Sequence, residues 1–417
     1  MKRKLLSLIL ALSIMLSLFT FTASASVRTQ SEHGSAAANL ENLSKSRTEN
    51  KVDPALVSAM NRFALRTGAK LLAKKGGCCS PVSLYYALAL AAEGAKGQTA
   101  KEFYSLLGKD DLFLGRECPI LYRRLNQESG LSSLVMANSL WLDQEVGGLP
   151  VQYREDFLQR AAERYYAEAF TVDFSDSATG KKMGDWVSKK TKGKLSFALE
   201  SDDEQMLSIL NTVYYKSAWA EPFDKAATKK CNFQRADGKK KKVSFMHRTE
   251  KGSYYKGKGY VAASRAMGSG TVTFYLPDKG VKVDSLLKKK ELLTTALSKQ
   301  KSCMVQWSVP KFKTGSKWDV IPTLKALGVK SAFTDDADFS ALTDTPALIT
   351  SVDQGTCFEL NEKGAEAAAY THIGISKATA MLPRKQKTVK MNLNRPFLYT
   401  VTSAEGVVLF LGIYDGK

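Results

Sequence analysis

The chain has 417 residues, a formal net charge of +20 at pH 7 and six cysteines. This length allows one large domain or two smaller ones with a sizeable core. The basic residues are dispersed and are not interleaved with aromatic residues, so nothing predicts a nucleic-acid-binding surface. The chain has three histidines and contains neither G-x-S-x-G nor H-E-x-x-H, which argues against a hydrolase.

The first 25 residues have the features of a secretion signal. Three basic residues at 2–4 precede an apolar stretch over residues 5–21, and Ala23-Ser24-Ala25 is a small-x-small cleavage site. We therefore expect residues 1–25 to be removed on export to an extracellular location, with an uncleaved anchor helix as the alternative. Nothing else in the sequence is long and apolar enough to cross a bilayer. Residues 26–52 are polar and typical of a flexible lead-in.

Capping signals predict helices early in the following segment. Asp53-Pro54 supplies a cap and a first-turn proline for a helix over residues 55–75, and Ser80-Pro81 opens an almost wholly apolar, hence buried, helix over 82–93. Thr99, with Glu102 three residues later, predicts the start of the next helix. Two later helices are predicted over residues 153–170 and 318–327.

Apolar runs predict strands in the rest of the chain. They lie over residues 134–142, 207–215, 243–246, 272–276, 303–309 and 407–414. Residues 252–259 approach a phosphate-loop pattern, but Gly259 replaces the required Ser or Thr and the Tyr-rich context favours a strand pair. Strands and helices mix without βαβ alternation, so we predict a single α+β domain over residues 53–417.

The cysteines are even in number, and export permits disulfides. Two of them are adjacent, and such neighbours seldom bridge without strain. We interpret the six as mostly packed small apolar groups, with one or two bridges left open. The six are Cys78, Cys79, Cys118, Cys231, Cys303 and Cys357. Since no metal-type spacing exists, neither a metal ion nor a cofactor is expected.

Residues 359–378 have the pattern of a strand that lacks a sheet. Read with period two, one face is small and then branched and apolar, as suits burial. That face consists of Ala365, Ala367, Ala369, Thr371, Ile373 and Ile375. The other face consists of Glu366, Ala368, Tyr370, His372, Gly374 and Ser376. Because Gly364 and the alanines are poor strand formers, we expect a strand that forms only when it finds a partner.

This stretch also resembles the reactive-loop hinge of the serpins, Glu-x-Gly-(Thr/Ser)-Glu-Ala-Ala-Ala. It reads Glu362-Lys363-Gly364-Ala365-Glu366-Ala367-Ala368-Ala369, with Ala365 in place of Thr or Ser. Further landmarks follow in family order, notably Asn211-Thr212-Val213-Tyr214-Tyr215-Lys216-x-x-Trp219 and Val309-Pro310-Lys311-Phe312. The resemblance covers essentially the whole mature chain. It implies an α+β serpin fold with three β-sheets, about eight or nine helices and an exposed reactive-centre loop near residues 362–390.

The resemblance also implies a sheet that opens to accept this loop. Small polar residues in apolar elements suit such a sheet, because a polar network can be satisfied in two arrangements. The sheet-opening residues are Ser80, Ser83, Asn211, Trp219 and Gln354. The family often has a His in the region of Gln354. Gln354 can form hydrogen bonds but cannot ionise, so pH-dependent opening through that His is not expected.

The function that the resemblance implies is irreversible inhibition of serine proteases, and not an enzymatic activity. The target attacks the loop, forms a covalent acyl complex and is trapped when the cut loop inserts into the sheet. Family spacing places the reactive bond at Ala378-Thr379, which suits elastase-like or subtilisin-like targets, with Lys377 and trypsin-like targets as the alternative. The rival interpretation is a non-inhibitory serpin that acts as a carrier, a chaperone or a protease substrate. We also expect a monomer with weak polyanion binding through the basic surface.

Overall fold

The computed structural model describes residues 51–73, 76–130, 132–196, 199, 205–290, 292–293, 299–365 and 387–417. Residues Lys51–Lys417 form one compact unit, which is distinct from Met1–Asn50. The predicted signal peptide and nearly all of the predicted lead-in lie outside the described residues. Among the described residues, no helix is long and apolar enough to span a bilayer.

The two predicted N-terminal helices are confirmed. Helix α3 (Pro54–Leu71) begins after Asp53, whose carboxylate accepts the Ala55 N–H at 2.7 Å. Helix α4 (Pro81–Glu93) is buried along nearly its whole length, as its apolar composition predicts. The hydroxyl of Ser80 does not cap α4, because it donates to the Leu409 carbonyl at 2.8 Å.

The predicted cap of the next helix is wrong. Helix α5 (Gly97–Leu107) begins two residues before Thr99, and its N-cap is Lys96. The Thr99 hydroxyl instead accepts the Asp338 N–H at 3.0 Å, and the Glu102 carboxylate accepts the N–H groups of Lys330 and Ser331. Both side chains therefore fix α5 to a segment more than 200 residues away rather than closing its first turn. Helix α6 (Asp111–Leu125) follows.

Two predicted helices are shorter than their periodicity indicates. Helix α7 (Glu155–Tyr165) ends where Tyr166 adopts a left-handed conformation with φ of 53°. The rest of the predicted helix forms strand β6 (Ala167–Val172). Helix α10 covers only Ile321–Ala326, and Trp318 belongs to strand β13 (Phe312–Asp319).

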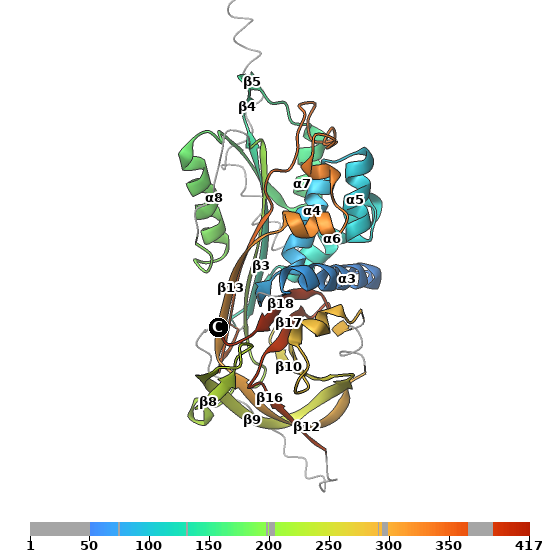
Figure 1. The fold of residues 1–417 in the computed structure, drawn as a ribbon. Coiled ribbons are helices and arrows are strands. Elements are labelled where there is room, and N and C mark those ends of the chain that lie inside the picture. Colours follow the sequence, from blue (N-terminus) through green and yellow to red (C-terminus); the bar gives the residue numbers. More distant parts are fainter. Residues whose placement is uncertain are drawn as a thin grey trace, which may run out of the picture. The chain divides into compact units, whose positions relative to one another are not determined.

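A seven-stranded sheet is the central layer of the fold. Its order is β13, β14 (Asp353–Asn361), β15 (Gly364–Ala365), β7 (Leu207–Ala218), β3 (Ser132–Asp143) and β2 (Gln127–Glu128), and β6 pairs with β3 in parallel. Helix α8 (Ser177–Lys190) covers one face, and α4 with its neighbouring helices covers the other (Figure 1). Trp186 and Val187 of α8 pack with Trp141 of β3.

The second sheet has nine strands. Its order is β1 (Gly77–Cys79), β18 (Val408–Tyr414), β17 (Phe397–Ser403), β11 (Gly270–Pro277), β10 (Tyr260–Met267), β9 (Lys240–Gly257), β12 (Lys301–Pro310) and β16 (Thr388–Asn392), and β8 (Lys229–Gln234) pairs with the start of β9. Strand β9 is longer than predicted because different strands pair with its two ends. Residues 252–259 form the end of β9 and its turn into β10, as the Tyr-rich context predicts.

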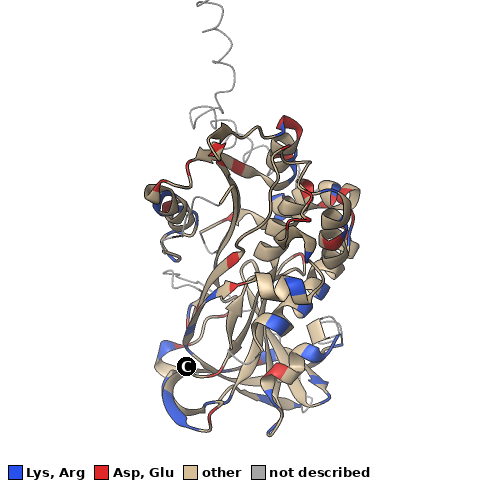
Figure 2. Ribbon diagram, turned by 45° about the horizontal axis from the view of Figure 1, so that its top comes forward, with Lys and Arg blue, Asp and Glu red and all other residues tan. Residues whose placement is uncertain are grey.

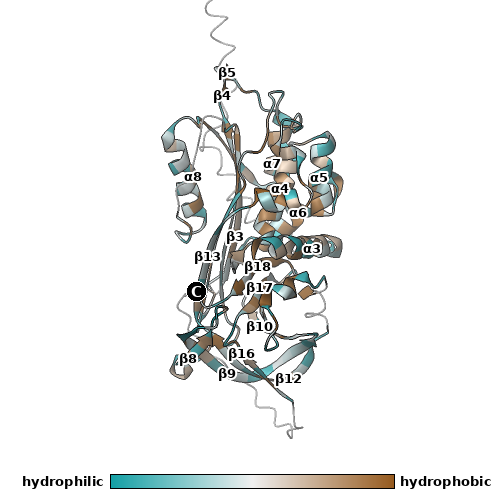
Figure 3. Cartoon of the chain, in the orientation of Figure 1, coloured by the Kyte–Doolittle hydropathy of each residue, from teal (hydrophilic) through white to brown (hydrophobic). Residues whose placement is uncertain are grey.

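Strands β4 (Glu145–Val146) and β5 (Leu149–Pro150) form a third, two-stranded sheet. Short 3₁₀ turns cover Lys225–Ala227, Val283–Lys288 and Ser331–Phe333. Hydrophobic residues concentrate on α4 and on β17 and β18 of the second sheet (Figure 3). The predicted α+β fold is confirmed. All six cysteines carry free thiols, so none of the bridges that the sequence left open is present.

Candidate functional site

The site is a gap between β7 and β14 in the seven-stranded sheet. In the described part of the chain, the two residues of β15 join these strands at one end only, with Ala365 opposite Ser217 on one side and Leu360 on the other. Beyond β15 lies a cavity. Its walls are residues 213–215 of β7 and 355–359 of β14, and Ser80, Ser83, Phe410, Thr191, Lys194 and Leu195 close it. The sheet is thus paired at one end and hollow next to that pairing.

Gly364 allows β15 to approach β7 closely. Its φ is 149°, a conformation that other residues rarely adopt. A Cβ atom at this position would lie 2.1 Å from the Ser217 carbonyl oxygen and 2.8 Å from the Ala218 Cα. Ala365, the next residue, is only 1% exposed. The glycine is therefore required for the first pair of the inserted strand.

Glu362 fixes the turn that leads into β15. Its carboxylate lies 2.9 Å from the Lys311 Nζ atom and accepts the Thr228 hydroxyl at 2.9 Å. Its carbonyl accepts the Phe223 N–H at 3.0 Å. Burial alone would raise the pKa of the Glu362 carboxyl, but the hydrogen bonds from Lys311 and Thr228 outweigh burial and lower this pKa.

Trp219 lies where β15 begins. Its indole N–H donates to the Asn361 carbonyl at 2.9 Å, and its backbone N–H donates to the Lys363 carbonyl at 2.9 Å. The Arg265 guanidinium lies 4.8 Å from the indole ring, and the Glu250 carboxylate pairs with this guanidinium at 2.7 Å. The indole is thus held between the hinge turn and a buried cation.

Two of the predicted sheet-opening residues form a reciprocal pair behind the gap. The Ser80 N–H donates to the Gln354 side-chain oxygen at 3.0 Å, and the Gln354 amide donates to the Ser80 carbonyl at 2.9 Å. This pair connects β14 to the start of α4. Because a side-chain amide has both a donor and an acceptor, it satisfies both backbone groups without ionising.

Two more of the predicted residues, Ser83 of α4 and Asn211 of β7, form a second group. The Ser83 hydroxyl donates to the Asn211 carbonyl at 3.3 Å, and the Asn211 amide donates to the Asn138 side-chain oxygen. The Asn138 amide in turn donates to the Tyr165 carbonyl at 2.5 Å. Ser80 and Ser83 therefore line the cavity and contact Gln354 of β14 and Asn211 of β7, respectively, whereas Trp219 lies at the end of the gap that β15 occupies.

Sequence reasoning assigned no role to four residues that hold this arrangement. They are Thr228, Glu250, Arg265 and Lys311. Lys311 could have been found from the sequence, because it occurs in the family landmark Val309-Pro310-Lys311-Phe312. No sequence motif pointed to the other three residues. The predicted hinge residues Glu366, Ala367, Ala368 and Ala369 lie outside the described residues. So do Lys377, Ala378 and Thr379 of the predicted reactive bond.

A family model and individual relatives of known identity match most of this chain and agree on its family. A family model described as serpin (serine protease inhibitor) matches residues 58–415. The chain is 27% identical over 385 residues to Serpin-Z1C of Triticum aestivum, covering 85% of this chain and 95% of the relative. It is 28% identical over 399 residues to alpha-1-antichymotrypsin of Homo sapiens, covering 91% and 92%.

Solved structures resemble the fold closely. The native state of tengpin, a thermophilic serpin, has a TM-score of 0.79 and 27% identity, covering 88% of this chain and 96% of that one. Human thyroxine-binding globulin in complex with thyroxine has a TM-score of 0.77 at 22% identity, covering 87% of this chain and 99% of that one. Native protease nexin-1 with heparin has a TM-score of 0.76 at 19% identity, covering 87% and 99%. The last two likenesses concern the fold alone.

Proposed function

The chain belongs to the serpin family, and we propose that it is an irreversible suicide-substrate inhibitor of serine proteases. One observation carries the proposal. The first two residues of the loop, Gly364 and Ala365, already pair with both β14 and β7, at the end of a gap that continues between these strands.

The register of β15 supports insertion of the following residues. If the pairing continues residue by residue, Ala367 comes to lie between Tyr215 and Phe358, and Thr371 between Asn211 and Gln354. Phe358 and Gln354 are buried, as is Leu360 beside Ala365. The small and branched face of the loop would thus meet the buried side of the sheet, in agreement with its period-two pattern. In this register the loop can pair with residues of β7 as far as Leu207, which would lie opposite Ile375.

Insertion provides the free energy that inhibition needs. The target serine attacks the reactive carbonyl, forms an ester with Ala378 and releases the chain that begins at Thr379. About ten new ladder hydrogen bonds, at roughly 1 kcal/mol net each, give a drive on the order of 10 kcal/mol. Displacement of a single oxyanion donor in the protease slows acyl chemistry by about 10²–10³-fold. Inhibition follows if insertion is faster than hydrolysis of the ester.

The target class follows from the reactive bond. We propose Ala378-Thr379 and hence elastase-like or subtilisin-like proteases, with Lys377 and trypsin-like proteases as the alternative. The mature protein is incubated separately with elastase, subtilisin and trypsin, then analysed by denaturing gels and mass spectrometry. We expect a covalent band and a released peptide that begins at Thr379. A peptide that begins at Ala378 would assign the specificity to Lys377.

A non-inhibitory carrier, chaperone or substrate is the second candidate, favoured by the similarity in fold to thyroxine-binding globulin. The alanines of the hinge argue against it, because small residues can be buried in the gap. To separate the inhibitory from the non-inhibitory candidate, the loop is cleaved with a protease that the protein does not trap, and the melting temperature of the cleaved protein is measured. We expect the melting temperature to rise after cleavage as the loop inserts. An unchanged melting temperature, together with no covalent band for any protease, would contradict inhibition.

We propose further that the protein acts as an exported monomer. The signal features support removal of residues 1–25, with a flexible lead-in over 26–52 and one domain over 53–417. Its role is that of a bait and not of an enzyme, because the target supplies the nucleophile and the loop supplies the bond. A polyanion is a second partner, since the net charge of the full chain is +20, of which 20 − 3 = +17 remains after removal of residues 1–25, and a protein of the same fold was solved with heparin.

A further inference from the structure

We propose that the β8–β9 hairpin binds an extended phosphate polyanion through a row of three exposed lysines. Asn232 pairs with Lys242 and Gln234 pairs with Lys240, so these four side chains share one face of the two-stranded ribbon with Lys230. Phe233 occupies the opposite face and is fully buried. The proposal locates the polyanion partner and does not depend on protease inhibition.

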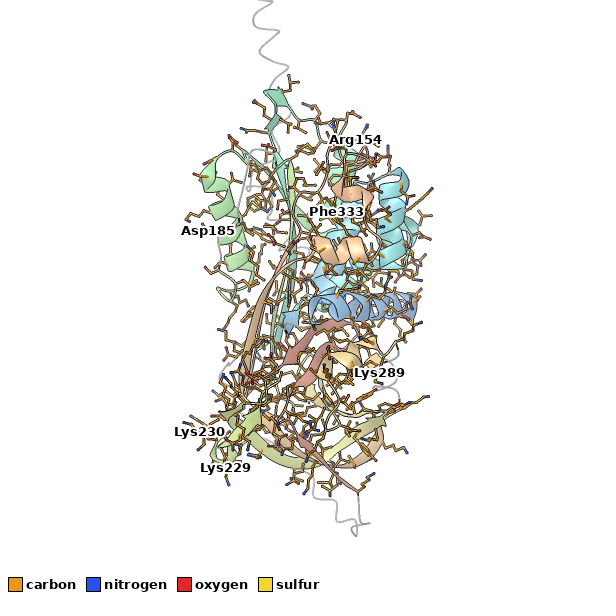
Figure 4. The ribbon with its side chains drawn as sticks, viewed as in Figure 1. Arg154, Asp185, Lys229, Lys230, Lys289 and Phe333 are labelled. Atoms are coloured by element: carbon orange, nitrogen blue, oxygen red, sulfur yellow. The ribbon has the colours of Figure 1, made fainter. Side chains whose placement is uncertain are left out.

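The spacing of these lysines is set by the strands. Lys240 and Lys242 are two residues apart on β9, about 7 Å along the strand. Lys230 pairs with Ser244 and is therefore the diagonal neighbour of Lys242, at about 7–8 Å. All three are exposed. Figure 4 shows Lys230, with its neighbour Lys229, at the β8 edge of the molecule. The row thus extends along the ribbon and suits a linear ligand.

The charge of the hairpin is not balanced by neighbouring carboxylates. Among the described residues, Lys230, Lys240 and Lys242 have no ion-pair partner, and Asp237 of the turn is paired with Arg235 at 3.2 Å. The lysines near α8 differ, because Lys181 pairs with Asp185 at 2.6 Å and Lys192 with Glu128 at 2.6 Å. Figure 2 shows the corresponding concentration of basic residues at the β8 end of the molecule. The hairpin therefore attracts anions, whereas the α8 lysines are largely neutralised.

The composition of the face indicates the class of polyanion. Its residues are lysines and uncharged amides, and the aromatic Phe233 points to the opposite side. Ammonium groups bind phosphate as point charges, whereas recognition of single-stranded nucleic acid adds base stacking on aromatic side chains. This face offers nothing for a base to stack on. A phosphate chain without bases therefore fits it better than single-stranded nucleic acid.

The test measures binding of long-chain inorganic polyphosphate by the full mature protein at several sodium chloride concentrations. Two triple variants are compared with the wild type. One is Lys230→Gln/Lys240→Gln/Lys242→Gln. The other is Lys288→Gln/Lys289→Gln/Lys290→Gln, which removes the same net charge elsewhere on the surface. Melting temperatures check that both variants fold.

We expect the hairpin variant to lose at least about tenfold in affinity, and the slope of log K against log salt to become shallower by about 2, since three fewer phosphates are neutralised. The affinity of the control variant for polyphosphate should stay within about twofold of the wild-type affinity, because its lysines do not contact the polymer. Equal losses in both variants would show that net charge alone attracts the polymer and would overturn the proposal. So would tighter binding of oligothymidylate than of polyphosphate with the same number of phosphates, since that indicates a nucleic-acid site.

Discussion

Replacement of Ala367 by arginine tests whether the loop inserts in the register that β15 begins. In that register residue 367 lies between Tyr215 and Phe358, which are 7% and 3% exposed. No carboxylate is among these neighbours, so the guanidinium would enter the sheet without a partner. An uncompensated buried charge costs about 3–5 kcal/mol. If half of this cost, about 2 kcal/mol, is felt in the transition state, insertion slows by about 30-fold.

The assay separates covalent complex from cleaved inhibitor on a denaturing gel, with the protease that traps the wild type. We expect Ala367→Arg to lower the ratio of complex to cleaved inhibitor by about 30-fold, so that the inhibitor becomes a substrate. The matched control is Glu366→Arg, which adds the same side chain one residue earlier, on the outward face between Lys216 and Glu359. An unchanged ratio for Ala367→Arg, or an equal fall in both variants, would refute the register.

Three further substitutions test the hinge. Gly364→Ala places a Cβ atom 2.1 Å from the Ser217 oxygen, so we expect a loss of about 1–3 kcal/mol in denaturant unfolding and faster exchange of the Trp219 amide, which donates to the Lys363 carbonyl; unchanged exchange would argue against the β15 pairing. Trp219→Phe leaves the buried Asn361 carbonyl without its indole donor, and calorimetry should show a stability loss of about 1–3 kcal/mol. Because the folded pKa of Glu362 is lowered, its stabilisation is complete above the ordinary carboxyl pKa of about 4.3 and disappears as pH falls through the lowered value. The stability difference between wild type and Glu362→Gln should therefore shrink on acidification, and a difference that grows would contradict the Lys311 contact.

Helices and strands that are apolar along most of their length were predictable from the sequence. Helix α4 and strands β3 and β7 lie where their apolar composition places them. For α4 and β3, which are buried along most of their length, this composition alone was sufficient. The end of α7 was not predictable. Residues 167–170 continue the helical periodicity, but Tyr166 ends the helix in a left-handed conformation and Phe170 stacks on Trp141 at 4.4 Å. A distant partner overrides the local pattern here.

The sequence indicated part of the candidate site, but not the contacts that its residues make. The period-two pattern identified the face of the loop that Ala365 begins, and the structure places Ala365 on the buried side of the sheet. By contrast, Gln354 and Ser80 are 274 residues apart, and no local pattern reveals that they exchange two hydrogen bonds. Arg265 is similar, because a buried arginine is recognisable only beside the Glu250 carboxylate that compensates its charge.

The two hydrogen bonds between Ser80 and Gln354 lead to a prediction about how the proposed opening of the sheet depends on pH. An inserted loop would place Thr371 beside Gln354, so this amide must accommodate a new neighbour while it holds the Ser80 backbone. A histidine in this position would change its hydrogen bonding as it ionised near neutral pH. An amide keeps one donor and one acceptor at every pH. The Ser80–Gln354 pair should therefore add no pH dependence to the rate of loop insertion between about 5 and 8.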